Sequence, residues 1–304
     1  MIHDFFADRS PYRGRFAPSP TGALHFGSLV AALGSWLRAR AAGGVWLIRI
    51  EDIDPPRERA GAATDILETL RAFGMTSDEP IEFQSGRHEY YQAALQRLID
   101  QGDAFACACT RSDLAPGGIH RGACKRSEGQ RAWRLRVPES PWQFYDGVAG
   151  AFVQHSHTVG DFVLWRADGL PAYQLAVVVD DDAQGITEVV RGSDLLDSTP
   201  RQIYLQQKLG FATPNYLHLP LVLDERGQKL SKSLASMPVD REAPLRTLRH
   251  ALAFLAQPQH TGIQKLDQLL DAAVAHFDAA SIPRSSILPQ RIDEAAAPPA
   301  SGTR

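Results

Sequence analysis

The sequence predicts an α/β protein built around a parallel sheet, with an inserted subdomain and a short helical appendage. Near the N-terminus, short β-prone runs alternate with a long stretch of helical apolar spacing, which is the pattern of a β-α-β unit. The chain has 304 residues with 44% hydrophobic content, enough for one large core that carries an insertion.

The first β-α-β unit is expected over residues 13–51. A strand is predicted near 13–17, a helix near 26–42 and a second strand near 45–51, and Gly43-Gly44 ends the helix. Parallel units of this kind bind ligands at the C-terminal ends of their strands. We therefore expect a site where these two strands end.

The turn after the first strand has the features of a phosphate site. Pro18 and Pro20 stiffen it, and it leads to His25, where helical spacing begins. The first helical amides and the imidazole can then face one anion together. The alternative is an ordinary loop with a hydrogen-bonded surface histidine. A second signature, KLSKS over 229–233, favours the phosphate site.

Three carboxylates, Glu51, Asp52 and Asp54, follow the second strand, where they can meet a cation or an ammonium group. Asp54 can instead cap the next helix, which is predicted near 57–73. Another helix is predicted near 87–101. Its apolar stripe is expected in the core and consists of Tyr90, Tyr91, Leu95, Leu98 and Ile99.

The rest of the chain divides by pattern. Residues 161–165 are a strand candidate, the β-branched run over 186–190 predicts another strand, and helical spacing recurs near 241–256 and 263–277. The expected units are a first half of the catalytic domain (1–101), an inserted subdomain (102–184), a second half (185–240), a helical appendage (241–293) and a Pro/Ala/Ser-rich disordered tail (294–304).

All three cysteines fall in one window of the insertion. Tetrahedral zinc needs four N or S donors, which Cys107, Cys109, His120 and Cys124 can supply from two short loops. The alternative is three ordinary thiols and a surface histidine. The clustering favours one structural Zn²⁺ site over a disulfide framework, and a closed site of this kind supports folding rather than chemistry.

Charge and hydropathy limit the partners. The formal net charge of -3 argues against indiscriminate nucleic-acid binding, so an RNA partner needs a local patch. Basic and aromatic side chains interleave in the insertion and form either such a patch or a solvated face: Arg121, Lys125, Arg126, Arg131, Arg134, Arg136, Trp133 and Trp142. No membrane-spanning stretch or signal peptide is evident, so a cytoplasmic protein without a membrane partner is expected.

These motifs resemble those of one enzyme family. RFAPSPTGALHFGS over 15–28 is similar to the HIGH-type signature of class I aminoacyl-tRNA synthetases of the glutamyl branch, and KLSKS is similar to their KMSKS signature. WLIRIEDID over 46–54 and VVRGSD over 189–194 also resemble segments of these enzymes. The resemblance covers residues 12–240 and implies the Rossmann-like parallel sheet of class I synthetases, with the insertion handling tRNA.

The resemblance also implies roles for single residues. Glu51 would bind the α-amino group of the amino acid, Tyr173 would line its pocket, and Ala17 and Ser19 would contact it. Lys232, on a mobile loop, would close over the phosphates together with Mg²⁺. The residues that would contact ATP are His25, Gly27, Lys229, Ser231 and Lys232.

Two arginines give a physical reason to prefer glutamate over glutamine. Arg15 precedes the first turn and Arg191 ends a later strand, so both guanidiniums are expected at one cleft. Such a pair is unfavourable without an anion. A side-chain carboxylate would supply that anion, whereas a neutral amide would leave donors facing donors.

The implied reaction is attack of the glutamate α-carboxylate on the α-phosphorus of ATP. Ser28 stands where the usual signature has a second histidine, and His120 stands where the zinc knuckle often has a tyrosine. The His-Phe-Gly-Ser sequence over 25–28 and the small zinc motif around Cys107–Cys124 resemble those of glutamyl-queuosine tRNA(Asp) synthetases, which are truncated relatives of the glutamyl enzymes. Little chain follows Ser233, so no anticodon-binding domain is expected. This implies a monomer that activates glutamate without tRNA and transfers it to queuosine in the anticodon loop of tRNA(Asp).

Three other functions stay open at this stage. A truncated glutamyl-tRNA synthetase would charge a tRNA 3′ end. A HIGH-type nucleotidyltransferase would use a small-molecule acceptor. A zinc-stabilised RNA-binding module would have lost activation altogether.

Overall fold

The structure is a computed structural model, and it describes residues 11–126, 128–222 and 239–284. The KLSKS segment, with Lys229, Ser231 and Lys232, and the tail predicted over 294–304 lie outside these ranges. Within them, no helix combines the length and apolarity needed to cross a bilayer.

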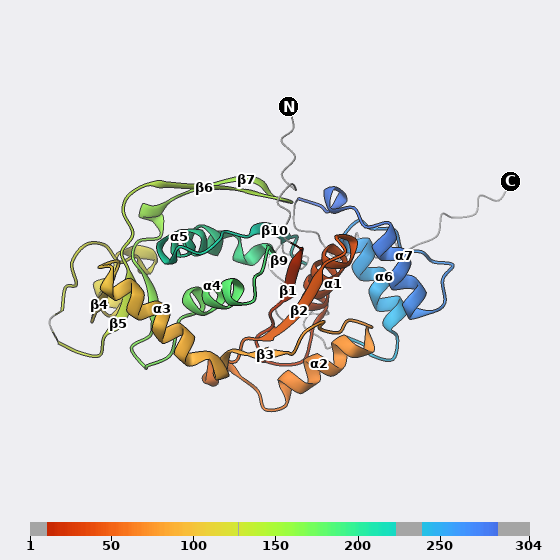
Figure 1. Ribbon diagram of the computed structural model, residues 1–304, viewed down its shortest axis with the longest axis horizontal. Coiled ribbons are helices and arrows are strands. Elements are labelled where there is room, and N and C mark those ends of the chain that lie inside the picture. The colour runs from red at the N-terminus through yellow and green to blue at the C-terminus, as the bar shows by residue number, and fades with distance from the viewer. Residues whose placement is uncertain (1–10, 127, 223–238, 285–304) are drawn as a thin grey trace.

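Two groups of parallel strands form the centre of the molecule (Figure 1). β1 (Arg13–Phe16) pairs with β2 (Val45–Ile50), which pairs with β3 (Glu82–Phe83). β9 (Glu188–Gly192) pairs with β10 (Asn215–Leu219). The groups meet at β1 and β9, where the Thr187 N–H donates to the Arg13 carbonyl at 2.9 Å. The prediction of an α/β protein with a parallel sheet is confirmed.

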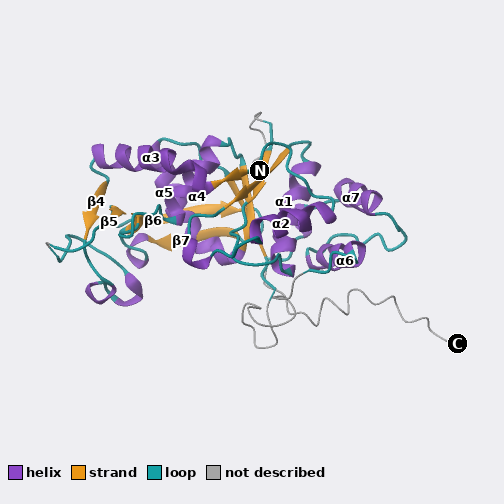
Figure 2. Ribbon diagram, turned by 90° about the horizontal axis from the view of Figure 1, so that it is seen from below, coloured by secondary structure: helices purple, strands orange, loops and turns teal. Residues whose placement is uncertain are grey.

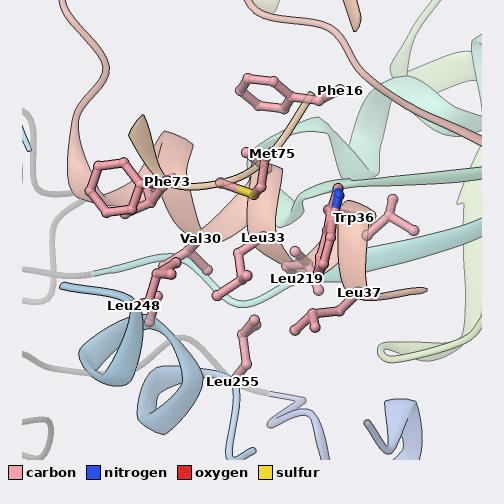
Figure 3. Packing of buried hydrophobic residues seen from close by; sticks show 14 of the residues in the cluster. Phe16, Val30, Leu33, Trp36, Leu37, Phe73, Met75, Leu219, Leu248 and Leu255 are labelled. Atoms are coloured by element: carbon pink, nitrogen blue, oxygen red, sulfur yellow. The ribbon is translucent and has the colours of Figure 1, made fainter. Parts of the chain in front are cut away.

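Helix α1 (Phe26–Ala41) is the centre of the main hydrophobic core. Its apolar side chains meet Phe16 of β1 and Leu219 of β10 (Figure 3). On the other side, α1 packs against α6 (Pro244–Phe254) and α7 (Leu266–Ala275). Full burial of each large apolar side chain contributes about 1.5–3 kcal/mol, so this packing fixes the start of α1 firmly against the sheet.

Two predictions about the next helices need correction. Helix α2 (Ala62–Ala72) begins later than expected, because a 3₁₀ turn (Pro55–Arg57) and Gly61 with a φ of 79° precede it. Helix α3 (His88–Asp100) matches its prediction, but Tyr90 is 56% exposed. Neighbouring positions on a helix differ by about 100°, so Tyr90 points outward when Tyr91 is buried.

A second core forms around α3, α4 (Tyr173–Ala183) and α5 (Thr199–Leu209). These helices pack against an antiparallel sheet, whose strands are β4 (Ala104–Cys107), β5 (Ala132–Leu135) and β8 (Phe162–Trp165). The views in Figures 1 and 2 place this sheet at the opposite end of the molecule from α6 and α7.

A separate hairpin connects the two regions. Its strands, β6 (Pro141–Asp146) and β7 (Gly150–His155), are antiparallel and run across α5 toward β10 (Figure 1). The turn of the hairpin touches β10, since the Gly147 N–H donates to the Tyr216 carbonyl at 2.9 Å. The hairpin therefore ends beside the strands that carry the site.

Candidate active site

A pocket of about 590 Å³ opens where β1, β2 and β9 end. Apart from the expected zinc ligands, every site residue that the sequence predicts within the described ranges lines this pocket, although these residues come from distant parts of the chain. They are Arg15, Ala17, Ser19, His25, Gly27, Glu51, Tyr173 and Arg191.

His25 caps the N-terminus of α1. Its backbone is extended, and its Nδ1 accepts a hydrogen bond from the Ser28 N–H at 3.2 Å. Because Nδ1 is an acceptor, the neutral ring carries its proton on Nε2, which lies 3.0 Å from the Ser28 hydroxyl. Helix dipoles favour anions at this position, so the ring and the helix end are arranged to meet a phosphate.

Arg15 is buried in the pocket wall and is paired with a carboxylate. Its Nε and Nη2 donate to Asp181 of α4 at 3.0 and 3.2 Å, and Arg49 donates to the same carboxylate at 2.7 Å. Burial acts to raise the pKa of Asp181, but the two guanidiniums hold it below its ordinary value. Asp181 thus supplies Arg15 with an anion from within the protein, and the contact of Arg15 with glutamate stays a prediction.

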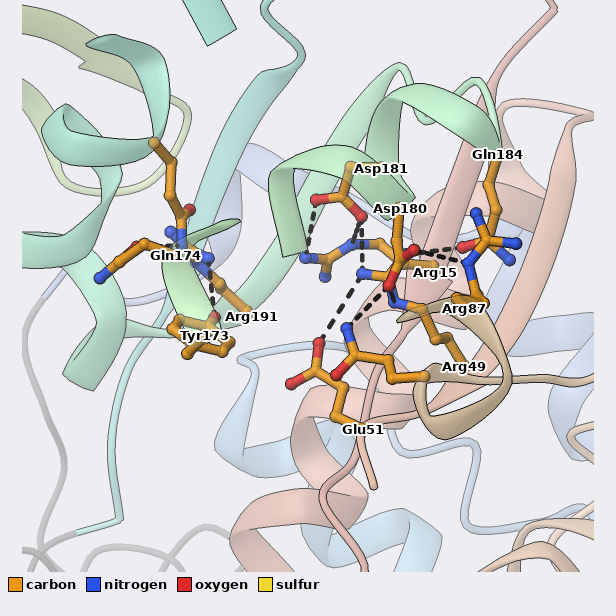
Figure 4. A network of polar contacts seen from close by, with 12 residues as sticks. Arg15, Arg49, Glu51, Arg87, Tyr173, Gln174, Asp180, Asp181, Gln184 and Arg191 are labelled. Atoms are coloured by element: carbon orange, nitrogen blue, oxygen red, sulfur yellow. Dashed lines mark hydrogen bonds and ion pairs between the residues drawn. The ribbon is translucent and has the colours of Figure 1, made fainter. Parts of the chain in front are cut away.

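Arg191 differs from Arg15 in its partners. It is 6% exposed, and no ion pair joins it to a carboxylate of the described residues. Its Nε donates to His218 at 3.1 Å and its Nη2 donates to Thr199 at 2.8 Å. Its Nη1 lies 3.4 Å from the Tyr173 hydroxyl, as Figure 4 shows. These partners hold the guanidinium, and within the described ranges no carboxylate compensates its positive charge.

Glu51 follows β2 and carries an unsatisfied oxygen. The side chain is 9% exposed, its Oε1 has no hydrogen-bond partner among the residues that the structure describes, and the Nη2 of Arg49 is 3.7 Å away. Burial raises the pKa of Glu51 to about 7, although Arg49 and Arg15 oppose the shift. An ammonium group in the pocket would satisfy the free oxygen and favour the ionised carboxylate.

The three predicted thiol ligands come together at the end of β4. The Sγ atoms of Cys107, Cys109 and Cys124 all lie within 4.8 Å of one another. Backbone N–H groups of Ala108 and Lys125 donate to the sulfurs of Cys124 and Cys109, each at 3.2 Å. Such donors favour the thiolate form that binds metals, so the cluster is consistent with a structural metal site.

His120 is not part of that thiol cluster. It is buried, its Nδ1 lies 2.8 Å from the Asp161 carboxylate, and its Nε2 has no hydrogen-bond partner in the described residues. An imidazole backed by a carboxylate, with its other nitrogen unused, has the donor chemistry of a metal ligand.

Part of the basic and aromatic run serves the interior of the protein. Arg134 is buried and donates to the Asp161 carbonyl at 3.0 Å, while Trp133 and Trp142 pack against the second core. Arg126 is exposed and pairs with Asp113 at 2.5 Å. Any RNA surface in this region must therefore use the exposed members of the run.

Comparison with known proteins identifies the family. The model described as tRNA synthetases class I (E and Q), catalytic domain, matches residues 12–125 and 120–247. The chain is 57% identical to the Glutamyl-Q tRNA(Asp) synthetase of Xanthomonas campestris pv. campestris (strain 8004), over 91% of this chain and 95% of that protein. The chain belongs to the glutamyl-Q tRNA(Asp) synthetase family.

Other comparisons agree. The glutamyl-Q tRNA(Asp) synthetase of Pseudomonas aeruginosa is 51% identical, over 92% of this chain and 98% of that protein. A glutamate tRNA ligase from Elizabethkingia meningosepticum, solved in complex with its amino acid, has the same fold, with a TM-score of 0.79 and 24% identity. That match covers 94% of this chain and 69% of the other. The class I synthetase fold that the sequence predicts is thus confirmed.

Sequence reasoning missed the buried network that supports the pocket in this glutamyl-Q tRNA(Asp) synthetase family member. Asp180 accepts from Arg87 at 2.6 Å and from Tyr91 at 2.8 Å, which ties α3 to α4. Asp181 holds Arg15 and Arg49 (Figure 4). The signal was present, because acidic residues that end a buried apolar run require partners.

Proposed function

We propose that this chain activates L-glutamate with ATP and transfers the glutamate to queuosine in tRNA(Asp). One observation carries the proposal: an uncompensated guanidinium and a buried carboxylate with a free oxygen line the same pocket. An amino acid with an acidic side chain brings a carboxylate for the first and an ammonium for the second. Membership of the glutamyl-Q tRNA(Asp) synthetase family supports this substrate and this acceptor.

In the glutamate site, Arg191 and the Tyr173 hydroxyl bind the side-chain carboxylate, and Glu51 binds the α-ammonium. Ala17 and Ser19 contact the amino acid from the turn between β1 and α1. Because Asp181 neutralises Arg15, Arg191 supplies most of the preference for glutamate over glutamine. A glutamine amide would place donors against this guanidinium, which costs roughly 1–3 kcal/mol.

In the activation step, an oxygen of the glutamate α-carboxylate bonds to the α-phosphorus of ATP, and pyrophosphate leaves. Charge develops on the phosphoryl oxygens, and the Nε2–H of His25 and the start of α1 stabilise it from one side. Gly27 lines the same wall and contacts the ATP. Lys229, Ser231 and Lys232, which lie outside the described residues, would also contact ATP, together with Mg²⁺.

The thiol cluster holds one Zn²⁺ ion with a structural role. Cys107, Cys109 and Cys124 would provide thiolates, and His120, which lies outside the thiol cluster, would provide its Nε2 as the fourth donor, because Asp161 occupies Nδ1. When bound, zinc cross-links the loops that flank β4.

For the acceptor, we propose a monomer in the cytoplasm that receives the anticodon loop of tRNA(Asp) in its cleft, with no membrane partner. Exposed basic side chains beside the thiol cluster, including Lys125 and Arg126, would exchange their contacts with Asp113 for contacts with the RNA backbone.

The test combines two assays. ATP-pyrophosphate exchange is measured with glutamate, glutamine and aspartate, first without RNA and then with glutamate tRNA, and glutamate alone is expected to support it in the absence of RNA. Labelled glutamate is then offered with tRNA(Asp) that carries or lacks queuosine, each with and without its 3′-terminal adenosine. Transfer should require queuosine and survive loss of the adenosine. Exchange that requires a glutamate tRNA, or transfer that requires the adenosine, would indicate an ordinary charging enzyme.

A further inference from the structure

Behind the pocket, His218 of β10 lies between Asp146 and Arg191. Its Nδ1 is 2.6 Å from the Asp146 Oδ2, and its Nε2 accepts the Nε–H of Arg191 at 3.1 Å. Asp146 and His218 are 0% and 1% exposed, and neither lines the pocket. Among the described residues, Arg191 is the one that links them to the proposed glutamate site.

The carboxylate of Asp146 fixes which nitrogen of His218 carries the proton. Its Oδ1 accepts the backbone N–H groups of Val148, Ala149 and His218, at 2.9, 2.8 and 3.2 Å. Its Oδ2 is left for the Nδ1–H of the ring. The ring nitrogen that faces Arg191 is therefore an acceptor.

The surroundings of the ring also favour its neutral form. Burial lowers the pKa of His218, and Arg191 lowers it further, while Asp146 acts in the opposite direction. The other groups that face the ring are the hydroxyl of Thr199 at 3.1 Å and the stacked ring of Tyr216, whose centroid is 6.1 Å away; Arg15 acts on it electrostatically. No carboxylate other than Asp146 contacts the ring among the described residues.

The two pocket arginines thus have contrasting partners. Arg15 is held by the carboxylate of Asp181, which neutralises it, whereas Arg191 is held by a neutral imidazole. A carboxylate in the place of His218 would cancel the charge of Arg191, and a protonated histidine would repel it. A neutral acceptor is the partner that fixes the orientation of Arg191 and leaves its charge for a ligand.

We propose that Asp146 and His218 are positioning residues for glutamate recognition, which hold the Nε of Arg191 so that its Nη1 edge, beside Tyr173, meets the substrate's side-chain carboxylate. The inference rests on the proposed role of Arg191 in glutamate binding. It assigns Asp146 and His218 to substrate specificity, although neither touches the substrate.

Asp146→Asn tests the relay with almost no change in shape. The Asn Oδ1 keeps the three backbone donors, so its Nδ2–H group faces the Nδ1 of His218. The ring proton must then move to Nε2, where a donor faces the Nε–H of Arg191. His218→Gln is the conservative variant, because one amide can donate to Asp146 and accept from Arg191. Tyr216→Phe is the matched control. Tyr216 lies in β10, like His218, and the substitution removes the buried hydrogen bond that its hydroxyl accepts from Gln206 of α5. The aromatic ring stays beside Arg191.

In glutamate-dependent pyrophosphate exchange, Asp146→Asn should raise the KM for glutamate by about tenfold or more, because a hydrogen bond to a charged group is lost. The KM for ATP should not change, and the preference for glutamate over glutamine should narrow. His218→Gln should stay within about threefold of the wild type, and Tyr216→Phe should match it. A folded Asp146→Asn protein with an unchanged KM for glutamate, or an equal effect of Tyr216→Phe, would overturn the proposal.

Arg191→Gln is measured in parallel, to distinguish failure of the proposed glutamate site from failure of the positioning role of Asp146 and His218. If it leaves the KM for glutamate unchanged, the proposed glutamate site is wrong, whatever Asp146→Asn does. If Asp146→Asn does not fold, ¹⁵N NMR of the wild-type imidazoles decides, with the His218 signals assigned by their loss in His218→Gln. The expected form near pH 7 has Nδ1 protonated and Nε2 bare, and a protonated Nε2 would overturn the proposal.

Discussion

Arg15 and Asp181 form a bidentate pair inside the pocket, with Nε and Nη2 at 3.0 and 3.2 Å from the two carboxylate oxygens. The pair joins β1 to α4, two elements far apart in the chain. It removes one of the two positive charges that the sequence alone places in the pocket. Arg191 then remains as the guanidinium that we propose selects an anionic side chain.

Asp181→Asn should destabilise the fold strongly. The substitution removes the negative charge shared by Arg15 and Arg49, and both guanidiniums are buried. Leaving a buried charge unpaired typically costs about 3–5 kcal/mol, which urea unfolding would measure. The control is Glu79→Gln, because the pair of Glu79 with Arg13 is exposed and should contribute less than about 1 kcal/mol. Equal losses in the two variants would contradict the role given to Asp181.

Glutamate activation should depend on the ionisation of Glu51. With a pKa of about 7, raised mainly by burial, this carboxylate is protonated in the free enzyme at low pH and cannot bind an ammonium. We expect kcat/KM for glutamate to fall as pH drops from 8 to 6, while the KM for ATP changes little. Glu51→Gln should have a low kcat/KM for glutamate at every pH, and this kcat/KM should no longer change between pH 8 and 6. A variant that keeps the wild-type pH profile would assign the titration to another group.

The same shift has a consequence for stability. Because the folded pKa of Glu51 lies above its unfolded value of 4.5, the folded state binds more protons between these values, and the contribution of Glu51 to stability declines as pH rises toward 7. Glu51→Gln should therefore be at least as stable as the wild type at pH 8 in thermal unfolding. A large loss of stability there would indicate that the ionised carboxylate supports the fold.

Zinc removal should affect folding more than activation. Cys109→Ser should lose about one equivalent of zinc by elemental analysis and unfold at a lower temperature, yet retain glutamate-dependent exchange. His120→Ala should release zinc to a chelator faster than the wild type. His157→Ala is the matched control, because His157 is an exposed histidine nearby. Equal zinc retention in both histidine variants would exclude His120 as a ligand.

Gly44→Ala should disturb the first β-α-β unit. A Cβ at this position would lie 2.4 Å from the Tyr12 carbonyl oxygen, the acceptor for the Val45 N–H at the start of the β1–β2 pair. Relieving such a contact requires a backbone shift, with an expected loss of roughly 1–3 kcal/mol by urea unfolding. Gly86→Ala provides the control, since its Cβ would meet no atom within 4 Å. Similar stability of the two variants would contradict the steric argument.

Much of the molecule could be predicted from local patterns. The elements β1, α1 and β2, the thiol cluster and the residues that line the pocket all follow from spacing and motifs. The predictions are wrong where the structure depends on geometry that no local motif encodes. The apolar character of Tyr90 predicts a core position, but its place on α3 turns it outward. The helical spacing predicts a longer α2 than the structure has, because the conformation of Gly61 is not visible in that spacing.

The sequence by itself determined which chemical groups this protein has: a capped helix start after a stiff turn, carboxylates after a strand, three clustered thiols and two arginines at strand ends. These follow from neighbours along the chain, whose spacing sets local structure. Only the tertiary structure decided which charges remain available. Asp181 compensates the charge of Arg15, whereas His218 binds Arg191 without compensating its charge. Both partners come from other elements of the fold. Electrostatic interactions depend on distance in space and on burial, and neither can be read from the order of residues.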